Sequence, residues 1–310
     1  MIWRTMDMTL WKKYELRTYS RVLALLLSMI LLLSTGVFQP TASAEESLEV
    51  WNPDSYEIHL MLDSDLVLDE NHLLKQEYLD LFEVDDSYKT FSLAYYETQE
   101  RDFFQEGWIN RLRLKYEEDA EKDFKLTYKK RYSVPENDLT AAVHLAETEG
   151  FDLLSGLWEP QIDWGYTGMT LSLSAEAAVP TGGKKTIADL NPEDGFAMML
   201  ENMPEQEQDW KGEHRGSDLF ESAVMVGPIF FNRYKGEYLN RKVNIEIWEI
   251  HDERDGAVYY LSELSFKEKS YPEAAENRQM VMDALLERGI LLKVDSLKTQ
   301  QMLDAYLVSP

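Results

Sequence analysis

The sequence predicts an α+β protein built on an antiparallel β-sheet with flanking helices. Segments in which apolar and polar side chains alternate outnumber segments with helical spacing. Several of the alternating segments follow one another directly, as strands of hairpins do. Hydrophobic residues make up 44% of the chain and aromatic residues 12%, so the sequence is that of a globular protein with a substantial core.

In the first half of the chain, residues 57–62 alternate, which predicts a half-buried strand. Residues 66–82 carry apolar side chains at helical spacing, which predicts one helix. A helix is also expected after Pro135, ending at Gly150, because proline favours a helix start and glycine a helix end. Three further strands are predicted between these helices, at residues 90–97, 108–116 and 123–132.

In the second half, residues 162–174 predict one or two strands, and residues 180–184 predict a turn. Residues 187–203 predict a helix that is interrupted near Pro192. A polar segment follows, and no internal repeat is present. The remaining predicted elements are strands at 222–234, 243–250 and 257–267 and helices at 272–288 and 296–308.

The first 44 residues have the pattern of a secretory signal peptide. Basic residues precede an uncharged apolar run at 22–38, and small residues end at Ala44. We therefore expect cleavage after Ala44 and export of residues 45–310 as a secreted or cell-surface domain. An uncleaved anchor is the alternative, and it would be the only expected link to a membrane. The chain has no cysteine, so we expect no disulfide in the exported domain.

The chain is strongly acidic, with 57 Asp and Glu against 31 Lys and Arg and a formal net charge of −26. Nucleic acid is not an expected partner, because its phosphate backbone binds to basic surfaces. An acid excess of this kind usually forms a solvated exterior. Basic residues that gather in one place are therefore informative in this sequence.

Two consecutive predicted strands each carry a stripe of cations. Period-two alternation places the cations of each strand on one face and apolar residues on the other. Like charges on neighbouring strands are destabilising, so the stripes need counter-ions. Either acidic residues of other strands neutralise them, or they bind a polyanion. The cations are Arg111, Arg113 and Lys115 on the first strand and Lys125, Lys129 and Arg131 on the second.

Carboxylates on other predicted strands suggest a metal site beside these cations. Glu57, Glu249 and Glu263 are the candidate ligands, since Mg²⁺ and Mn²⁺ take carboxylate oxygens and bridge them to phosphate oxygens. Lys267 and Arg233 are further candidates for contacts with a phosphate chain.

Parts of the sequence resemble CYTH domains, also called triphosphate tunnel metalloenzymes. Residues 95–113, YYETQERDFFQEGWINRLR, are similar to a characteristic stretch of that family, and residues 124–127 and 260–290 resemble later parts. The resemblance covers about 55–135 and 220–290, and we treat about 136–219 as an inserted region. It implies an eight-stranded antiparallel β-barrel that forms a tunnel and hydrolyses triphosphates with Mg²⁺ or Mn²⁺.

The sequence departs from the family pattern at the metal site. The opening E-x-E-x-K motif is represented by Glu57, His59 and Met61, and the closing E-x-E motif by Glu263 and Ser265. Three hypotheses follow. The protein is a secreted, metal-dependent triphosphate or polyphosphate phosphohydrolase, a non-catalytic binder of such a polyanion, or a structural protein of the cell surface whose strand charges pair with one another.

Overall fold

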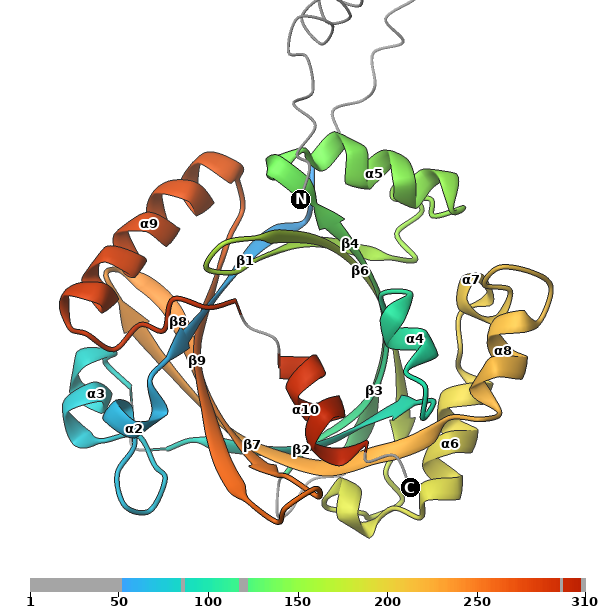
Figure 1. Cartoon of the computed structure of the whole chain (residues 1–310), viewed down its shortest axis with the longest axis horizontal. Helices are drawn as coiled ribbons and strands as arrows, with labels where there is room; N and C mark the ends of the chain where they lie inside the picture. The colour runs from blue at the N-terminus through green and yellow to red at the C-terminus, as the bar shows by residue number, and fades with distance from the viewer. Residues whose placement is uncertain (1–51, 85–86, 117–121, 296–297, 308–310) are drawn as a thin grey trace, which may run out of the picture. The chain divides into compact units, whose positions relative to one another are not determined.

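A closed barrel of nine strands forms the centre of the molecule (Figure 1). The computed structural model describes residues 52–84, 87–116, 122–295 and 298–307. The expected signal peptide lies outside these residues. The strands are β1 (Ser55–Leu62), β2 (Lys89–Glu97), β3 (Trp108–Lys115), β4 (Asp123–Val134), β5 (Glu159–Trp164), β6 (Met169–Pro180), β7 (Val224–Tyr238), β8 (Arg241–His251) and β9 (Val258–Glu268).

The strand order around the barrel is β1-β5-β6-β4-β3-β2-β7-β8-β9, and β9 pairs with β1 to close it. The predicted α+β class and the barrel are confirmed. The barrel has nine strands instead of the implied eight, and it is mixed, because β1 and β5 pair in parallel. Both β5 and β6 come from the region 136–219, so part of the presumed insertion belongs to the barrel.

The longer helices surround this ring. Helices α5 (Leu139–Thr148), α6 (Pro192–Glu201) and α9 (Tyr271–Glu287) lie outside it, whereas α10 (Lys298–Tyr306) overlaps its interior (Figure 1). No helix among the described residues is long and apolar enough to cross a membrane. The short helices are α2 (Ser64–Val67), α3 (Gln76–Leu81), α4 (Asp102–Gln105), α7 (Glu205–Gln208) and α8 (Arg215–Phe220), with 3₁₀ turns at Pro135–Asn137 and Ile187–Asp189.

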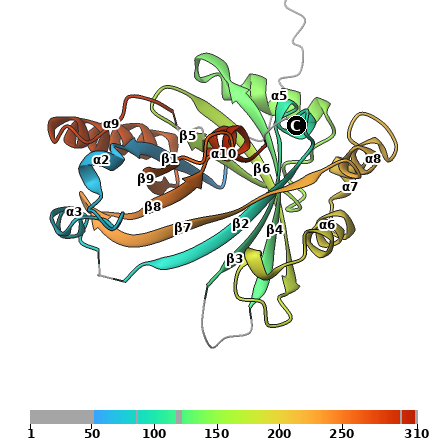
Figure 2. The same ribbon diagram turned by 60° about the horizontal axis from the view of Figure 1, so that its bottom comes forward.

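Strand β7 connects two groups of helices. It runs from the side of α8 to the side of α3 (Figure 2), where the backbone N–H of Glu237 donates to the carbonyl of Phe82. The prediction of one continuous helix at 66–82 is wrong, because a non-helical segment separates α2 from α3. There the Asp69 carboxylate accepts hydrogen bonds from the backbone N–H groups of Asn71 and Leu73. An Asp side chain that binds nearby N–H groups favours a turn over a helix.

The apolar side of α10 fills one part of the barrel interior. Met302 and Leu303 are buried there, together with inward-facing residues of β2, β7 and β8. Burying side chains of this size contributes about 1.5–3 kcal/mol each. The C-terminal helix is therefore held inside the barrel wall by apolar contacts, and this fixes the position of its first residue, Lys298.

Outside the barrel, Glu207 on α7 is completely buried. Its carboxyl group makes no ion pair with any described residue. Burial disfavours the charged form and raises the pKa of Glu207 to about 8 from an ordinary 4.5. The folded protein thus loses stability as the pH rises from about 4.5 to about 8, since the unfolded chain releases this proton first.

We expect the Glu207→Gln variant to match the wild type in stability near pH 4 and to exceed it at pH 8 by about 1–3 kcal/mol. Glutamine keeps the shape of the side chain and cannot ionise. Urea unfolding at both pH values measures the difference, and Glu205→Gln on the exposed face of the same helix is the control. A stability difference that is the same at both pH values would contradict the prediction.

Candidate functional site

The barrel encloses a cavity of about 820 Å³. Its described lining includes eight Lys or Arg residues and eight Asp or Glu residues, together with His59. The whole chain has almost two acids for each basic residue, so the inside of the barrel is far richer in cations than the rest of the protein. These charges separate into a cationic wall and a cluster of carboxylates.

The cationic wall consists of Arg111 and Arg113 on β3 and of Lys125, Lys129 and Arg131 on β4. The strands are neighbours, and register places Arg113 directly opposite Lys125. Alternate residues of β4 point outward and are buried under helices, where the Tyr128 hydroxyl donates to the carbonyl of Met199 on α6. The predicted pair of stripes is therefore present and faces inward.

The other predicted cations are placed as follows. Arg233 on β7 and Lys267 on β9 line the cavity, whereas Lys115 lies at the end of β3 and is not in the lining. Arg233 binds Glu246 at 2.6 Å, and Lys267 lies 3.3 Å from Glu57. Seven of the eight predicted cations thus share one cavity.

Part of the wall is neutralised by carboxylates. Lys125 pairs with Glu176 at 2.5 Å, while Lys129 and Arg131 lie 3.4 and 3.6 Å from Asp163. Burial alone would raise the pKa of Asp163, but Lys129 and the nearby imidazole hold that pKa well below its ordinary value. Asp163 is therefore ionised and serves two cations.

Arg111 and Arg113 have no such partner. Neither guanidinium makes an ion pair with a described residue, although the ring of Phe91 lies 5.6 Å from the Arg113 Cζ. Burial, and after it the charges of Arg111 and Arg233, lower the pKa of Arg113 to about 9, while the carboxylates of Glu246 and Glu176 act in the opposite direction. Arg113 is therefore a buried guanidinium beside two other cations, and no carboxylate within ion-pair distance among the described residues compensates it.

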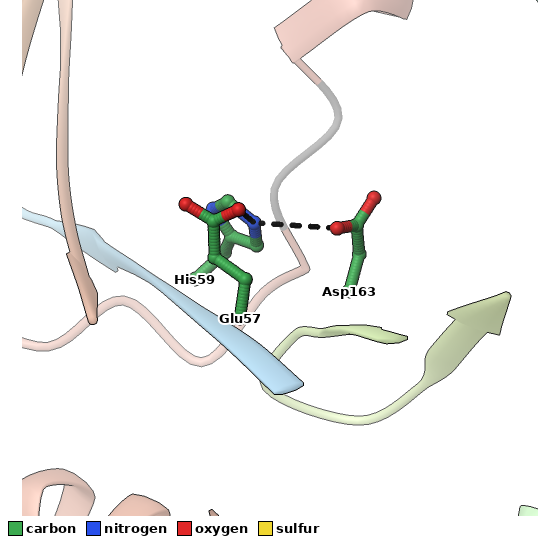
Figure 3. Close-up of side chains that lie close together, drawn as sticks. All are labelled: Glu57, His59 and Asp163. Atoms are coloured by element: carbon green, nitrogen blue, oxygen red, sulfur yellow. Dashed lines mark ion pairs between the residues drawn. The ribbon is translucent and has the colours of Figure 1, made fainter. Parts of the chain in front are cut away.

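The carboxylate cluster surrounds His59 on β1. Its Nδ1 lies 3.0 Å from Glu263, and its Nε2 lies 3.8 Å from Asp163 and 4.0 Å from Glu57. Figure 3 shows Asp163 facing Glu57 and His59, with an ion pair from the imidazole to each carboxylate, and the two carboxylates come from the parallel strands β5 and β1. The side-chain amide of Gln161 donates to both of these carboxylates at 2.6 Å.

Glu57, His59 and Asp163 fit a divalent metal ion in donor chemistry. One atom from each lies within 4.8 Å of the other two. Two carboxylates and one imidazole suit Mn²⁺ or Zn²⁺ better than Mg²⁺, which prefers oxygen ligands. Glu57 is thus placed as predicted, while Asp163 was not predicted, because its position depends on the long-range pairing of β5 with β1.

The predicted ligand Glu249 does not lie with the others. It is on the opposite face of β8, where it pairs with His251 at 2.6 Å outside the cavity. Glu246, three residues earlier, faces inward instead. Residues an odd number apart on a strand point to opposite sides, so only one of the two could join the cluster.

Glu263 lies inside as predicted, but protein cations surround it. Besides His59, the ammonium of Lys298 lies 2.6 Å from it, and the same ammonium lies 3.0 Å from Glu246. Lys298 was missed because its contact with the carboxylates depends on how the C-terminal helix packs against the barrel. Its position near the start of the helix predicted at 296–308 was the available signal.

We expect His59 to stay protonated up to about pH 9 when no metal is present. Burial would lower its pKa, but Glu263, Asp163 and Glu57 outweigh burial and raise the pKa to about 10. The NMR titration of its imidazole, assigned with a His59→Gln variant, measures this. A midpoint near the ordinary value of 6.5 would contradict the arrangement of carboxylates around the ring.

No protein-family model matches the sequence, and no curated protein matches it. Among solved structures, a Hippeastrum protein assigned as an adenylyl cyclase, with a dominant triphosphatase activity, has 14% identity and a TM-score of 0.49 over 81% of this chain and 96% of that chain. An assigned adenylate cyclase of Bacillus halodurans has 12% identity and a TM-score of 0.45 over 81% and 97%. An assigned adenylate cyclase of Vibrio parahaemolyticus has 12% identity and a TM-score of 0.37 over 80% of this chain and 98% of that chain. The chain is similar to these solved structures over about four fifths of its length and at low sequence identity.

Proposed function

We propose that the barrel binds a linear phosphate anion, a triphosphate or an inorganic polyphosphate, along its cationic wall. The observation that supports this most directly is the pair Arg111 and Arg113, two inward-facing guanidiniums without a carboxylate partner among the described residues. Guanidinium groups bind phosphate oxygens through two parallel hydrogen bonds. An anion with several charges would offset the burial and the neighbouring cations that lower the pKa of Arg113.

The arrangement favours an extended anion over a single phosphate. The wall continues from Arg113 and Lys125 near one end of the paired strands to Lys129 and Arg131 further along β4. Residues two apart on a strand are about 6.6 Å apart, so neighbouring cations would contact different phosphates of an extended chain. The cavity of about 820 Å³ has the size of a typical small-molecule site.

Metal-dependent hydrolysis of that ligand is the second candidate function. The group Glu57–His59–Asp163 favours it, because Asp163 also contacts Lys129 and Arg131 of the wall. These three residues would hold the ion next to the phosphate chain. A divalent ion there would polarise a phosphoryl oxygen and lower the pKa of a water molecule. The wall arginines would bind the charge that develops on the phosphate oxygens.

The two remaining hypotheses, a non-catalytic binder and a structural protein, use the cationic wall differently. A non-catalytic binder would use the same wall without metal, and the replacement of family positions by His59, Met61 and Ser265 motivates it. A structural protein would use the cations only for internal pairing. We further propose, from the pattern of residues 1–44, that the protein acts outside the cytoplasm, where polyphosphate or an anionic wall polymer would be available.

The Arg113→Met variant is expected to unfold at the same temperature as the wild type or a higher one, and to lose most of its stabilisation by tripolyphosphate. Methionine removes the repelled charge and keeps much of the apolar stem. At about 100 times its dissociation constant, the ligand should stabilise the wild type by about 2.7 kcal/mol. Thermal unfolding with and without tripolyphosphate measures both effects.

Arg215→Met, on the exposed N-terminal end of α8, is the matched control and should keep the full ligand effect. If Arg113→Met instead melts several degrees lower and tripolyphosphate shifts neither protein, the wall is an internal ion-pair network. The structural hypothesis would then replace the binding proposal.

For the second candidate, we expect Asp163→Asn to lower Mn²⁺-dependent phosphate release from tripolyphosphate at least about tenfold, because a metal ligand is lost. Glu249→Gln is the control, since Glu249 lies outside the cavity and should leave the rate unchanged. Wild-type protein that binds tripolyphosphate but releases no phosphate with Mn²⁺ or Mg²⁺ would reject hydrolysis and leave the binder.

A further inference from the structure

The carboxylates of Glu246 and Glu263 form a second pair inside the barrel, beside the group around Glu57. They lie directly opposite each other on β8 and β9. Both residues are buried, with exposed fractions of 6% and 1%. Two like charges at opposed positions of neighbouring strands destabilise a sheet, and burial increases the cost. Arg233 pairs with Glu246 and His59 with Glu263, each from one side, and a cation that contacts both carboxylates would stabilise the pair further.

Lys298 supplies that cation. Its ammonium lies 2.6 Å from Glu263 and 3.0 Å from Glu246, and 4.8 Å from the centre of the Trp248 ring. Burial alone would lower the pKa of Lys298, but the two carboxylates outweigh burial and hold the pKa above its ordinary value. The ammonium is thus a permanent charge shared by the two carboxylates.

The rest of α10 fixes this lysine in place. Lys298 is the first residue of the helix, and the buried Met302 and Leu303 in the following turn pack against the barrel wall. A lysine side chain on a free segment would lose considerable conformational entropy on entering such a site. Here the apolar contacts of the helix hold the backbone of Lys298 close to the two carboxylates. Much of the entropy cost of placing the lysine is therefore already met when the helix packs against the barrel.

Two buried carboxylates around one cation form an arrangement that also suits a divalent ion with oxygen ligands. We propose that Lys298 is a tethered counter-ion that occupies a divalent-cation position between Glu246 and Glu263. It thereby restricts metal binding in the cavity to the position at Glu57, His59 and Asp163. This inference concerns cations only and holds whether or not the cavity binds polyphosphate.

The test counts the Mn²⁺ ions bound per chain by isothermal titration calorimetry, without any phosphate ligand. The Lys298→Met variant is expected to bind one more Mn²⁺ than the wild type, whatever number the wild type binds. Removal of one carboxylate as well, in Lys298→Met/Glu246→Gln, should abolish the gained site. Lys298→Arg keeps the charge and should bind the same number as the wild type.

Thermal unfolding provides the second measurement. Without metal, Lys298→Met should melt below the wild type because the two carboxylates lose their shared counter-ion, and Mn²⁺ should restore most of the difference. If Lys298→Met does not fold, Lys298→Gln replaces it in the same titration. An unchanged Mn²⁺ count in the neutral variant, or a gained ion in Lys298→Arg, would overturn the proposal. The failure of tripolyphosphate to bind would leave this comparison unaffected.

Discussion

The cost of enclosing charges inside a closed barrel is the constraint on which the rest of this structure depends. Sixteen formally charged Asp, Glu, Lys and Arg side chains line the cavity among the described residues. A charge removed from water must be paired, or it destabilises the fold by several kcal/mol. Asp163 between Lys129 and Arg131, Glu246 with Arg233, and Lys298 between two carboxylates all meet this requirement.

The charges are paired unevenly, so the two sides of the cavity differ in their net charge. Carboxylates gather around His59 and Lys298, where opposing cations hold them ionised. Arg111 and Arg113 on the opposite wall have no ion-pair partner in the part of the chain that the structure describes. A barrel that needed its charges only for stability would place carboxylates beside these arginines. The unbalanced wall is the basis of our proposal that an external anion completes the charge compensation.

The strand pattern could be predicted from the sequence because period-two alternation is local. It predicted both cationic stripes and their common face, and the structure confirms that Arg111 and Lys129 face one cavity. It failed between Glu246 and Glu249, because they are three positions apart and the apolar pattern around Trp248 does not show which one faces inward. Sequence alternation alone cannot choose between the two faces of a strand that is buried on both.

The residues that were missed depend on contacts between distant segments. Asp163 joins Glu57 through the parallel pairing of β5 with β1, although the two residues are more than a hundred positions apart in the sequence. Lys298 reaches Glu263 only because the last helix packs inside the barrel. The resemblance to CYTH domains predicted a tunnel, but the region 136–219 was outside it, and that region supplies two strands and a candidate metal ligand.

Isothermal titration calorimetry of tripolyphosphate into the metal-free protein tests the central claim most directly. The account predicts one binding site per chain, an affinity that falls as salt concentration rises, and loss of binding in the Arg111→Met/Arg113→Met double variant. Absence of binding by the wild type, or equal affinity in the double variant, would contradict the claim that the unbalanced cationic wall is a phosphate site.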